Sequence, residues 1–583
     1  MNHYMERFNQ WMQHPELDPE IKAELVRIQE NEKEIEERFY TQLSFGTGGL
    51  RGEIGAGTNR MNRYIIRKAT LGLSQYVHKK EDKNPSDQKS VVIAYDCRHK
   101  SPEFAEEAAL TLAHQGIRAY VYPALRSTPQ LSFTVRKLKA DAGIMITASH
   151  NPPEYNGYKA YGNDGAQLNL EDADEVIRYV NQVENELEVK IMDKQAAIEQ
   201  QLLVYLDNTL DQQYIDYVSS LAIETEMIRE MAEQYKIVFT PFHGTGLFPV
   251  EKVLDKVGFK KVKIMEEQAV PDPNFSTVKS PNPEEHAAFE LAIRYAKEHG
   301  ADMIMGTDPD ADRMGVVVQN KAGEYVVLTG NQTGALLLHY LLSRKKERGT
   351  LHPQDTICKT IVTSEMGRVI GEAFGVQTID TLTGFKFIGE KIRQFYENGT
   401  GRYLFGYEES YGYLVGDEVR DKDAIQAVLL SAEMGAYYKS KGMTLLDALE
   451  ELYQEHGYFK EDTISITLKG KEGVQKIVEA IDHLRSNPVT QCASQSVEMI
   501  EDYKKQERTI YTADGTVEGV EQILLPQSNV VKYFLKNGAW FCVRPSGTEP
   551  KLKIYIGVRG RSEQESLFQM AEIKEEIARV IPL

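Results

Sequence analysis

The sequence predicts an α/β protein of several domains, built mainly on parallel sheets. A chain of 583 residues is too long for one hydrophobic core, so three or four domains are expected. Short β-branched runs alternate with amphipathic stretches: the run 91–95 precedes a helix-like stretch at 101–116, and the run 236–240 precedes another at 247–258. Repeated strand, loop and helix is typical of a parallel sheet covered by helices.

Polar stretches near 185–210, 318–324 and 455–465 indicate domain boundaries. The last part differs in character, because strand-like runs at 540–543 and 553–558 flank a turn, which indicates an α+β module. The expected divisions are a helical extension at 1–40, α/β/α domains at 41–205, 206–320 and 321–455, and a final domain at 456–583.

The composition, 41% apolar and 27% charged residues, is that of an ordinary globular protein. No run approaches the ~20 consecutive apolar residues that a membrane-spanning helix needs. The first twenty residues have no apolar segment, so we expect no secretory signal. The cysteines lie far apart and form no C-x-x-C pair, which argues against disulfides or a zinc site and favours the reducing cytoplasm. They are Cys97, Cys358, Cys492 and Cys542.

The net charge of −19 restricts the partners that the protein can have. Such a surface repels nucleic acid and anionic membranes, so we expect neither as a partner. An acidic protein binds phosphate only where basic side chains and backbone N–H groups are concentrated. Local clusters of such groups therefore indicate where function lies.

The loop 143–159 places Ser149 after an apolar strand and before two prolines, which stop regular strand pairing. With His150 beside it and Lys159 ten residues on, Ser149 could carry a phosphoryl group. The flanks do not spell G-x-S-x-G, so a hydrolase nucleophile is not indicated. An ordinary turn remains an equal alternative for this fragment alone.

The loop 306–313 carries aspartates at alternate positions, Asp308, Asp310 and Asp312. Alternate carboxylates on an extended loop can point at one cation, and all-oxygen ligands favour Mg²⁺, one ion per chain. An EF-hand is excluded, because its sixth position would be Arg313 and its twelfth Gln319. A solvated acidic turn is the alternative, but the carboxylates would repel one another there. Arg313 could stabilise charge on a transferring phosphoryl group.

The turn 544–553 concentrates basic groups, hydroxyls and a glycine, which favours a phosphate clamp over an ordinary hairpin turn. Glu408, Glu409 and Ser410 could accept hydrogen bonds from sugar hydroxyls, although an acidic surface turn would look similar. The glycine-rich segment 45–57 contains Arg51 but matches neither a dinucleotide-binding motif nor a P-loop.

In order, the motifs TASHNP, DPDADR, GYEES and RPSGTEP resemble those of the α-D-phosphohexomutase superfamily, which contains phosphoglucomutase, phosphomannomutase and a phosphopentomutase branch. The resemblance covers roughly residues 40–580. It implies four domains around a central cleft: three related α/β/α domains and a C-terminal α+β domain that binds phosphate.

The resemblance also implies roles for individual residues. Ser149 would be the phosphorylated serine, and one of its phosphoryl oxygens would join Asp308, Asp310 and Asp312 on the metal. Lys422 or His150 would serve as general base and acid, and the sequence does not decide between them. The residues near the transferring phosphate would be Arg51, His150 and Lys422. From the residues themselves, Lys159 is a further catalytic candidate and Arg313 a further substrate-binding candidate. The sugar-binding residues would be Thr383, Gly384, Glu408 and Ser410. The distal phosphate clamp would be Arg544, Ser546, Gly547 and Thr548.

The implied reaction interconverts glucose 1-phosphate and glucose 6-phosphate through phosphoserine, with glucose 1,6-bisphosphate as intermediate and primer. Gly48, Phe385, Tyr407 and Tyr411 depart from the commoner pattern. These departures resemble a subgroup shared by Bacillus-type phosphoglucomutases and animal phosphopentomutases. Phosphopentomutase and phosphomannomutase activities are therefore alternatives within the superfamily.

Two further classes compete with a mutase. A metal-dependent sugar phosphatase would also need an acidic loop and a phosphate clamp, but the D-x-D-x-T signature is absent, since the loop reads Asp-Pro-Asp-Ala-Asp. A non-catalytic phosphosugar-binding protein would be expected to have lost Ser149 or an aspartate, and all are present. In every case the partner is a small phosphosugar. The chain could act as a monomer or a dimer.

Overall fold

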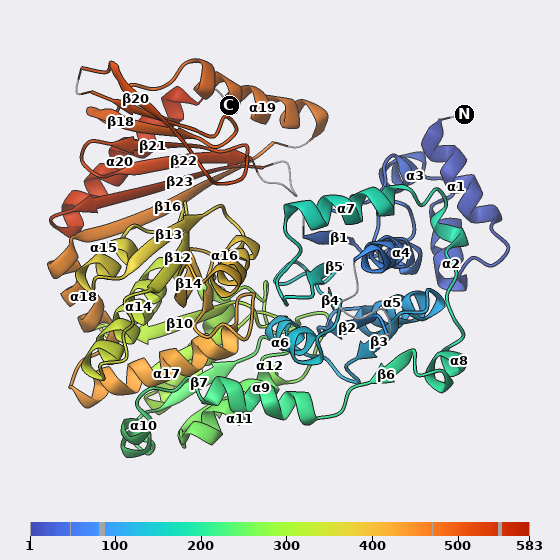
Figure 1. Cartoon of the computed structure of the whole chain (residues 1–583), viewed down its shortest axis with the longest axis horizontal. Coiled ribbons are helices and arrows are strands. Elements are labelled where there is room, and N and C mark those ends of the chain that lie inside the picture. Colours follow the sequence, from blue (N-terminus) through green and yellow to red (C-terminus); the bar gives the residue numbers. More distant parts are fainter. Residues whose placement is uncertain are drawn as a thin grey trace. The chain divides into compact units, whose positions relative to one another are not determined.

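A computed structural model describes residues 2–46, 48–80, 88–468, 470–512, 514–545 and 551–581 (Figure 1). The chain divides into two units. The first contains Met1–Leu328, Phe385–Phe405 and Tyr411–Lys441, and the second contains Thr329–Gly384, Gly406–Ser410 and Gly442–Leu583. No helix within the described ranges is both long enough and apolar enough to cross a membrane.

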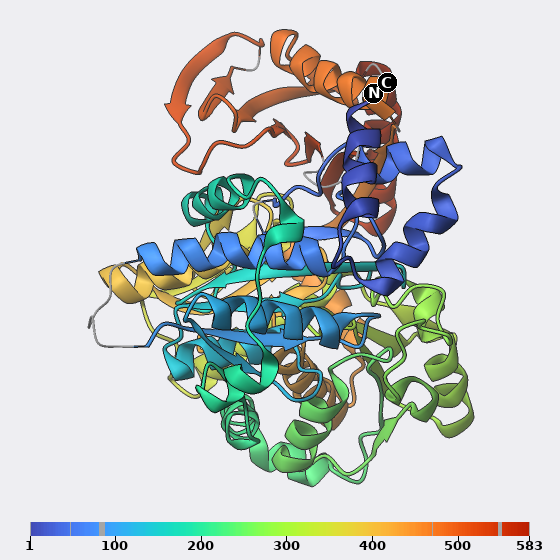
Figure 2. The same ribbon diagram turned by 90° about the vertical axis from the view of Figure 1, so that its right-hand side faces the viewer.

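The N-terminal residues of the first unit form the helices α1 (His3–Gln13), α2 (Pro19–Ile28) and α3 (Glu32–Phe39). Asp18 and Asn31 cap the last two by accepting hydrogen bonds from backbone N–H groups of the first turn. Trp11 and Phe39 are buried and pack edge to face. Trp11 also packs against Tyr64 of α4 (Arg63–Lys79), and Figures 1 and 2 show the N-terminal helices beside α4.

The first sheet has the strand order β1-β5-β4-β2-β3-β6. Strands β4, β2, β3 and β6 are parallel, as predicted, whereas β5 runs antiparallel to both β4 and β1. Residues of β2 alternate between two cores, one shared with α4, α5 and α7 and the other with α6, so every residue of β2 is buried. The strands are β1 (Gly49–Glu53), β2 (Ser90–Tyr95), β3 (Arg118–Val121), β4 (Ala142–Ile146), β5 (Tyr155–Gly162) and β6 (Leu203–Tyr205). The helices are α5 (Ser101–His114), α6 (Thr128–Leu138), α7 (Leu170–Asn181), η1 (Glu186–Glu188) and α8 (Lys194–Glu199).

The second sheet of this unit has the order β11-β10-β9-β7-β8, and β9 and β10 form an antiparallel pair. Helix α13 packs in the apolar core on one side of it, and α17, which is almost entirely buried, contacts β9 and β10. The strands are β7 (Ile237–Thr240), β8 (Val262–Ile264), β9 (Met303–Thr307), β10 (Met314–Gln319) and β11 (Tyr325–Val327). The helices are α9 (Thr209–Ser219), α10 (Thr225–Met231), α11 (Leu247–Val257), α12 (Glu266–Ala269), η2 (His286–Phe289), α13 (Glu290–His299) and α17 (Ala424–Ser440).

The chain crosses between the units several times. Helix α16 (Phe385–Asn398) and strand β15 (Gly412–Leu414) belong to the first unit, and β14 (Arg402–Glu408) begins in the first and ends in the second. Within the second unit, β12 and β13 pair in parallel. The surrounding elements are α14 (Gly330–Glu347), β12 (Asp355–Thr360), α15 (Met366–Ala373), β13 (Gln377–Thr381) and α18 (Leu445–His456).

The C-terminal part of the second unit is an antiparallel sheet in the order β16-β23-β22-β21-β18-β19-β20. Apolar residues of α19 and α20 share one core with the central strands, which is the α+β organisation expected from the sequence. The strands are β16 (Tyr458–Thr467), β17 (Gln491–Cys492), β18 (Gln495–Asp502), β19 (Glu507–Tyr511), β20 (Val517–Gln522), β21 (Val531–Leu535), β22 (Trp540–Pro545) and β23 (Lys551–Gly560). The helices are α19 (Gly470–Ser486) and α20 (Glu563–Val580).

Candidate active site

Ser149 lies in the loop between β4 and β5 and is almost completely buried. Its φ of 52° is in the left-handed region, a conformation that is unfavourable for serine and that the surrounding structure must stabilise. The Ser149 N–H donates to Thr147 Oγ1 at 2.8 Å, and the Ser149 hydroxyl donates to Asp308 Oδ2 at 2.7 Å. The serine oxygen therefore points at the aspartate loop that was predicted to bind a metal.

Arg98 holds the serine loop from beneath, a role that the sequence did not reveal. Its guanidinium is fully buried and donates to the carbonyl oxygens of Ser149, Asn151, Pro152 and Tyr155. The last two contacts measure 2.8 and 3.0 Å. One side chain thus holds the backbone from Ser149 to Tyr155.

Asp96 supports the same loop from the end of β2. Its carboxylate accepts a hydrogen bond from Thr147 Oγ1 at 2.6 Å and lies 3.4 Å from Arg98 Nε. Burial raises the pKa of Asp96 and lowers that of Arg98, while the charge of each opposes the shift of the other. The signal in the sequence is a D-x-R pattern directly after a buried strand.

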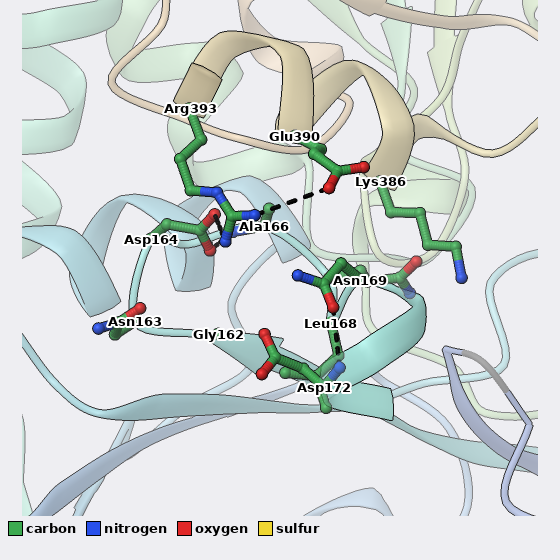
Figure 3. Close-up of a pocket in the computed structure, with 11 residues that line it drawn as sticks. Gly162, Asn163, Asp164, Ala166, Leu168, Asn169, Asp172, Lys386, Glu390 and Arg393 are labelled. Atoms are coloured by element: carbon green, nitrogen blue, oxygen red, sulfur yellow. Dashed lines mark hydrogen bonds and ion pairs between the residues drawn. The ribbon is translucent and has the colours of Figure 1, made fainter. Parts of the chain in front are cut away.

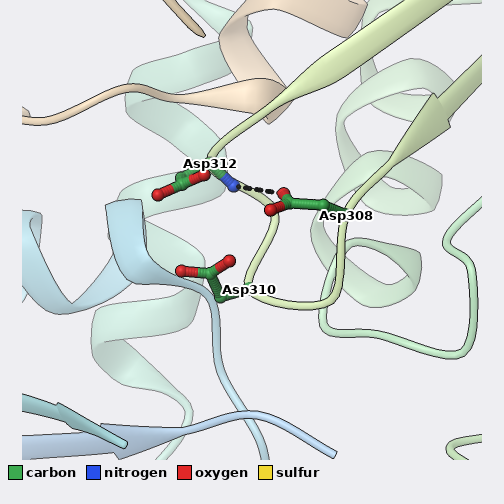
Figure 4. Close-up of side chains that lie close together, drawn as sticks. All are labelled: Asp308, Asp310 and Asp312. Atoms are coloured by element: carbon green, nitrogen blue, oxygen red, sulfur yellow. Dashed lines mark hydrogen bonds between the residues drawn. The ribbon is translucent and has the colours of Figure 1, made fainter. Parts of the chain in front are cut away.

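Asp308, Asp310 and Asp312 lie between β9 and β10, and all are buried (Figure 4). One carboxylate oxygen from each lies within 4.8 Å of the others. Two N–H groups close the turn by donating to Asp308 Oδ1: that of Asp312 at 3.1 Å, drawn as a dashed line in Figure 4, and that of Arg313 at 3.0 Å. Thr128, the first residue of α6, donates from Oγ1 to Asp310 Oδ2 at 2.7 Å.

Within the described ranges, basic groups form ion pairs with two of these carboxylates, Asp310 and Asp312. Lys159 Nζ lies 2.7 Å from Asp310 Oδ2 and 3.2 Å from Asp312 Oδ2. Lys422 Nζ lies 3.2 Å from Asp312 Oδ2. Burial acts to raise the pKa of Asp312, but the positive charges of Lys159, Lys422 and Arg313 outweigh this effect and lower it. The pKa of Asp308 is raised, mainly by burial and secondly by repulsion from Asp310 and Asp312.

The carboxylate oxygens of this cluster fit a divalent cation. Within the described part of the chain, Oδ1 of Asp310 and Oδ1 of Asp312 are buried and have no hydrogen-bond donor. Buried carboxylate oxygens without a partner are costly, and a cation would satisfy them. Because every available ligand is an oxygen, the cluster suits a hard cation such as Mg²⁺.

His150 and Arg51 complete the group in the first unit. His150 Nδ1 lies 3.4 Å from Ser149 Oγ, and Arg51 Nη1 donates to Asn151 Oδ1 at 2.9 Å. Burial, followed by repulsion from Arg313 and Arg51, holds the pKa of His150 well below its usual value, so the imidazole is neutral. The structure thus brings together the candidates Ser149, Arg51, His150, Lys159, Arg313, Lys422 and the aspartates of the metal loop.

In the second unit, the predicted sugar-binding and clamp residues also gather. The Gly384 N–H donates to Glu408 Oε1 at 3.0 Å, and Arg544 Nη1 donates to Thr383 Oγ1. Ser410 follows Glu408 in the same segment. The remaining clamp candidates, Ser546, Gly547 and Thr548, lie outside the described residues.

A small pocket elsewhere in the first unit contains none of these candidates (Figure 3). It lies between the end of β5, the start of α7 and the first turns of α16. Arg393 reaches across it and lies 3.8 Å from Asp164 and 3.7 Å from Glu390. Burial lowers the pKa of Lys386, which lines the same pocket, to about 8.

Family comparisons agree with this architecture. Domain descriptions of phosphoglucomutase/phosphomannomutase match four segments: α/β/α domain I at residues 42–187, domain II at 212–323, domain III at 329–456 and the C-terminal domain at 491–579. A phosphoglucomutase of Staphylococcus haemolyticus is 43% identical over 524 residues, which is 90% of this chain and 91% of that protein. A phosphoglucomutase of Staphylococcus aureus is 39% identical over 536 residues, covering 91% and 93%.

Solved structures share the fold at low sequence identity. The exocytosis-sensitive phosphoprotein parafusin, a phosphoglucomutase of Paramecium, superposes with a TM-score of 0.67 at 17% identity over 93% of this chain and 96% of that one. A phosphoglucomutase/phosphomannomutase family protein of Burkholderia thailandensis gives 0.65 at 18% identity, covering 93% and 98%.

The predicted fold class, three α/β/α domains followed by a C-terminal domain, is therefore confirmed. The chain belongs to the phosphoglucomutase/phosphomannomutase family of the α-D-phosphohexomutase superfamily. It is a mutase, an intramolecular phosphotransferase of the isomerase class.

Proposed function

We propose that this mutase interconverts glucose 1-phosphate and glucose 6-phosphate, and that Ser149 carries the migrating phosphoryl group. The observation that carries the proposal is the 2.7 Å hydrogen bond from Ser149 Oγ to Asp308 Oδ2, which aims the serine oxygen at a buried carboxylate cluster. The preference for glucose is supported by the relatives at 43% and 39% identity, which are phosphoglucomutases. We also propose that the protein acts in the cytoplasm, where its buried cysteines would remain reduced.

The reaction consists of two transfers that involve the same serine. In the first, the bond between phosphorus and Ser149 Oγ breaks while phosphorus bonds to a sugar hydroxyl oxygen; this hydroxyl loses its proton, Ser149 Oγ gains one, and the product is glucose 1,6-bisphosphate. In the second, the bond between the other phosphorus and its sugar oxygen breaks while this phosphorus bonds to Ser149 Oγ; the serine hydroxyl loses its proton, the sugar oxygen gains one, and the isomeric monophosphate is released. Glucose 1,6-bisphosphate would therefore also prime an unphosphorylated chain.

The residues of the first unit would position and neutralise the phosphoryl group. Arg98 and Asp96 hold the serine loop, and Arg51 reaches the same loop through Asn151. His150, 3.4 Å from Ser149 Oγ, is the better placed of the two candidates for moving a proton at the serine oxygen, because Lys422 is paired with Asp312 and Asp421. Mg²⁺, held by Asp308, Asp310 and Asp312, would supply electrostatic stabilisation of the phosphoryl charge.

The residues of the second unit would bind the rest of the substrate. Glu408, Thr383 and Gly384 offer hydrogen-bonding groups for sugar hydroxyls, with Ser410 beside them. Arg544 would hold the phosphate that does not react, together with Ser546, Gly547 and Thr548.

The proposal is tested by Ser149→Ala with Ser465→Ala, an exposed serine on β16, as the matched control. Wild type and Ser465→Ala should take up one phosphate from glucose 1,6-bisphosphate, detected by intact-mass spectrometry, and should turn over glucose 1-phosphate. Ser149→Ala should do neither. Normal turnover by Ser149→Ala would refute the covalent route, and stoichiometric phosphate release by wild type would indicate a phosphatase. Faster turnover of ribose or mannose 1-phosphate would overturn the preference for glucose.

A further inference from the structure

A cavity of about 320 Å³ lies between the N-terminal helical region and the first α/β core, away from the serine and aspartate loops. It is bounded by α1, the segment that joins α3 to β1, α4 and the end of α7. Cavities of this size hold small organic ligands. The polar groups that line it include Arg7, Gln42, Ser44, Lys68 and Asn181.

Lys68 is a buried cation that forms no ion pair with any residue that the structure describes. The residue is 6% exposed, and its Nζ donates to the neutral amide oxygen of Gln42 at 2.8 Å. Among the described residues, no carboxylate oxygen comes within 4.0 Å of this nitrogen. The carboxylate that acts on it from further away, Glu186, accepts a hydrogen bond from Trp11 Nε1 at 2.9 Å. A buried ammonium with one neutral partner leaves two N–H donors for a ligand.

Arg7 brings a second positive charge to the same cavity. Its Nη1 donates to the Phe39 carbonyl oxygen at 3.3 Å, and within the described chain it forms no ion pair. Its charge acts on Lys68, and this repulsion adds to burial in lowering the pKa of the lysine. Two cations that repel each other and border one cavity create a site for an anion.

The rest of the lining indicates which anion fits. Hydroxyl and amide groups of Thr41, Gln42 and Ser44 can bond to several oxygens of one group, as a phosphate requires. Leu50, Ile65, Ala69 and Val180 form an apolar wall, which suits the carbon skeleton of an organic phosphate better than a free inorganic ion.

We propose that this cavity is a second ligand site, separate from the active site, which binds the phosphate monoester of a small metabolite through Lys68 and Arg7. Its occupant would touch the strand that carries Arg51. Leu50 lines the cavity, and the next residue on β1, Arg51, bonds to Asn151 in the serine loop. Leu50 and Arg51 are neighbours on β1, and successive side chains of a strand point to opposite faces. A ligand that contacts Leu50 therefore restrains the same backbone that positions Arg51.

The test is hydrogen–deuterium exchange of the full-length protein with glucose 6-phosphate, and with glucose as the uncharged control. Glucose 6-phosphate should slow exchange in residues 40–50 of wild type, and glucose should not. In the double variant Arg7→Met, Lys68→Met this protection should disappear, and the dissociation constant measured at residues 40–50 should rise by at least about tenfold, since two charge-assisted hydrogen bonds are lost. Arg27→Met, which removes an exposed charge from α2, should behave as wild type.

Lys68→Met replaces a buried charge with an apolar side chain of similar length, so the double variant should unfold at a temperature no lower than wild type. Absence of protection at residues 40–50 in wild type, or equal protection in the double variant, would overturn the proposal. Protection of the serine loop at residues 147–156 and of the segment 406–410 reports ligand binding at the active site instead. The experiment therefore tests the second site separately from the proposed function.

Discussion

Replacing Arg98 should slow phosphoryl transfer, because this buried side chain holds the backbone of the serine loop. We consider Arg98→Lys, which keeps the positive charge beside Asp96 but replaces a planar guanidinium with a single nitrogen. The guanidinium serves four loop carbonyls from two separate nitrogens: Nη1 serves Pro152 and Tyr155, and Nη2 serves Ser149 and Asn151. One ammonium cannot occupy both nitrogen positions, so at least two carbonyls lose their donor.

The magnitude follows from those lost bonds. A buried polar group left without a partner costs roughly 1–3 kcal/mol, so two such carbonyls cost about 2–6 kcal/mol. Ser149 already has a left-handed backbone, which a loosened loop would abandon. If this cost adds to the activation free energy of phosphoryl uptake, even about 2 kcal/mol lowers the rate by about 30-fold.

The assay is quenched-flow measurement of phosphate uptake from glucose 1,6-bisphosphate, with hydrogen exchange of residues 147–156 measured in parallel. Arg98→Lys should slow uptake and increase exchange in this loop, and it should lower kcat with little change in KM for the sugar phosphate. The control is Arg485→Lys, which weakens the ion pairs that the largely buried Arg485 makes with Asp502 and Asp482 in the other unit. Normal uptake by Arg98→Lys, or equal losses in both variants, would refute the reasoning.

Three further predictions concern other parts of the chain. Lys386, whose pKa burial lowers to about 8, should reach half-maximal acetylation near pH 8 in a competitive labelling titration; a midpoint of about 10.4, the ordinary value for a lysine side chain, would contradict this. Burial raises the pKa of Asp423 to about 6, so ionisation opposes folding. As pH rises from about 4 to 6, wild type should therefore lose stability relative to Asp423→Asn, by about 2–3 kcal/mol in urea unfolding, and a constant difference would contradict this. A Cβ at Gly334 would lie 2.2 Å from the ring of Tyr407, the residue before the sugar-binding candidate Glu408. Gly334→Ala should therefore displace this segment and raise KM for the sugar phosphate by about tenfold, and an unchanged KM would contradict this.

The chemistry-bearing loops could be predicted from the sequence because each is local. The aspartates alternate within five residues, and the loop that carries them follows an apolar strand, as the structure shows for β9. The serine loop is marked in the same way by the apolar strand before it and the prolines after it. In both cases the residue types, their spacing and the strand end are readable without knowledge of any distant contact.

The supporting residues could not be predicted, because their partners are distant in sequence. Arg98 reaches carbonyls more than fifty positions further along the chain, and Thr128 bonds to Asp310 across 182 positions. Strand direction was also hidden: β5 and β10 are antiparallel to their neighbours, and their residues do not indicate it. Apolar periodicity reports which face is buried and carries no information about which strand lies beside it.

The distribution of charge around the aspartates explains why the serine and the predicted cation belong together. Lys159 and Lys422 neutralise Asp310 and Asp312. Asp308 receives a hydroxyl and two backbone N–H groups, but no ammonium from the residues that the structure describes. Phosphorylation of Ser149 would replace that hydroxyl with a group carrying nearly two negative charges. A carboxylate and a phosphate in contact inside a buried cluster repel strongly unless a positive charge lies between them. Among the described residues, the side of the cluster that faces the serine is thus the side without a lysine, and a divalent cation bound there would stabilise the phosphorylated state.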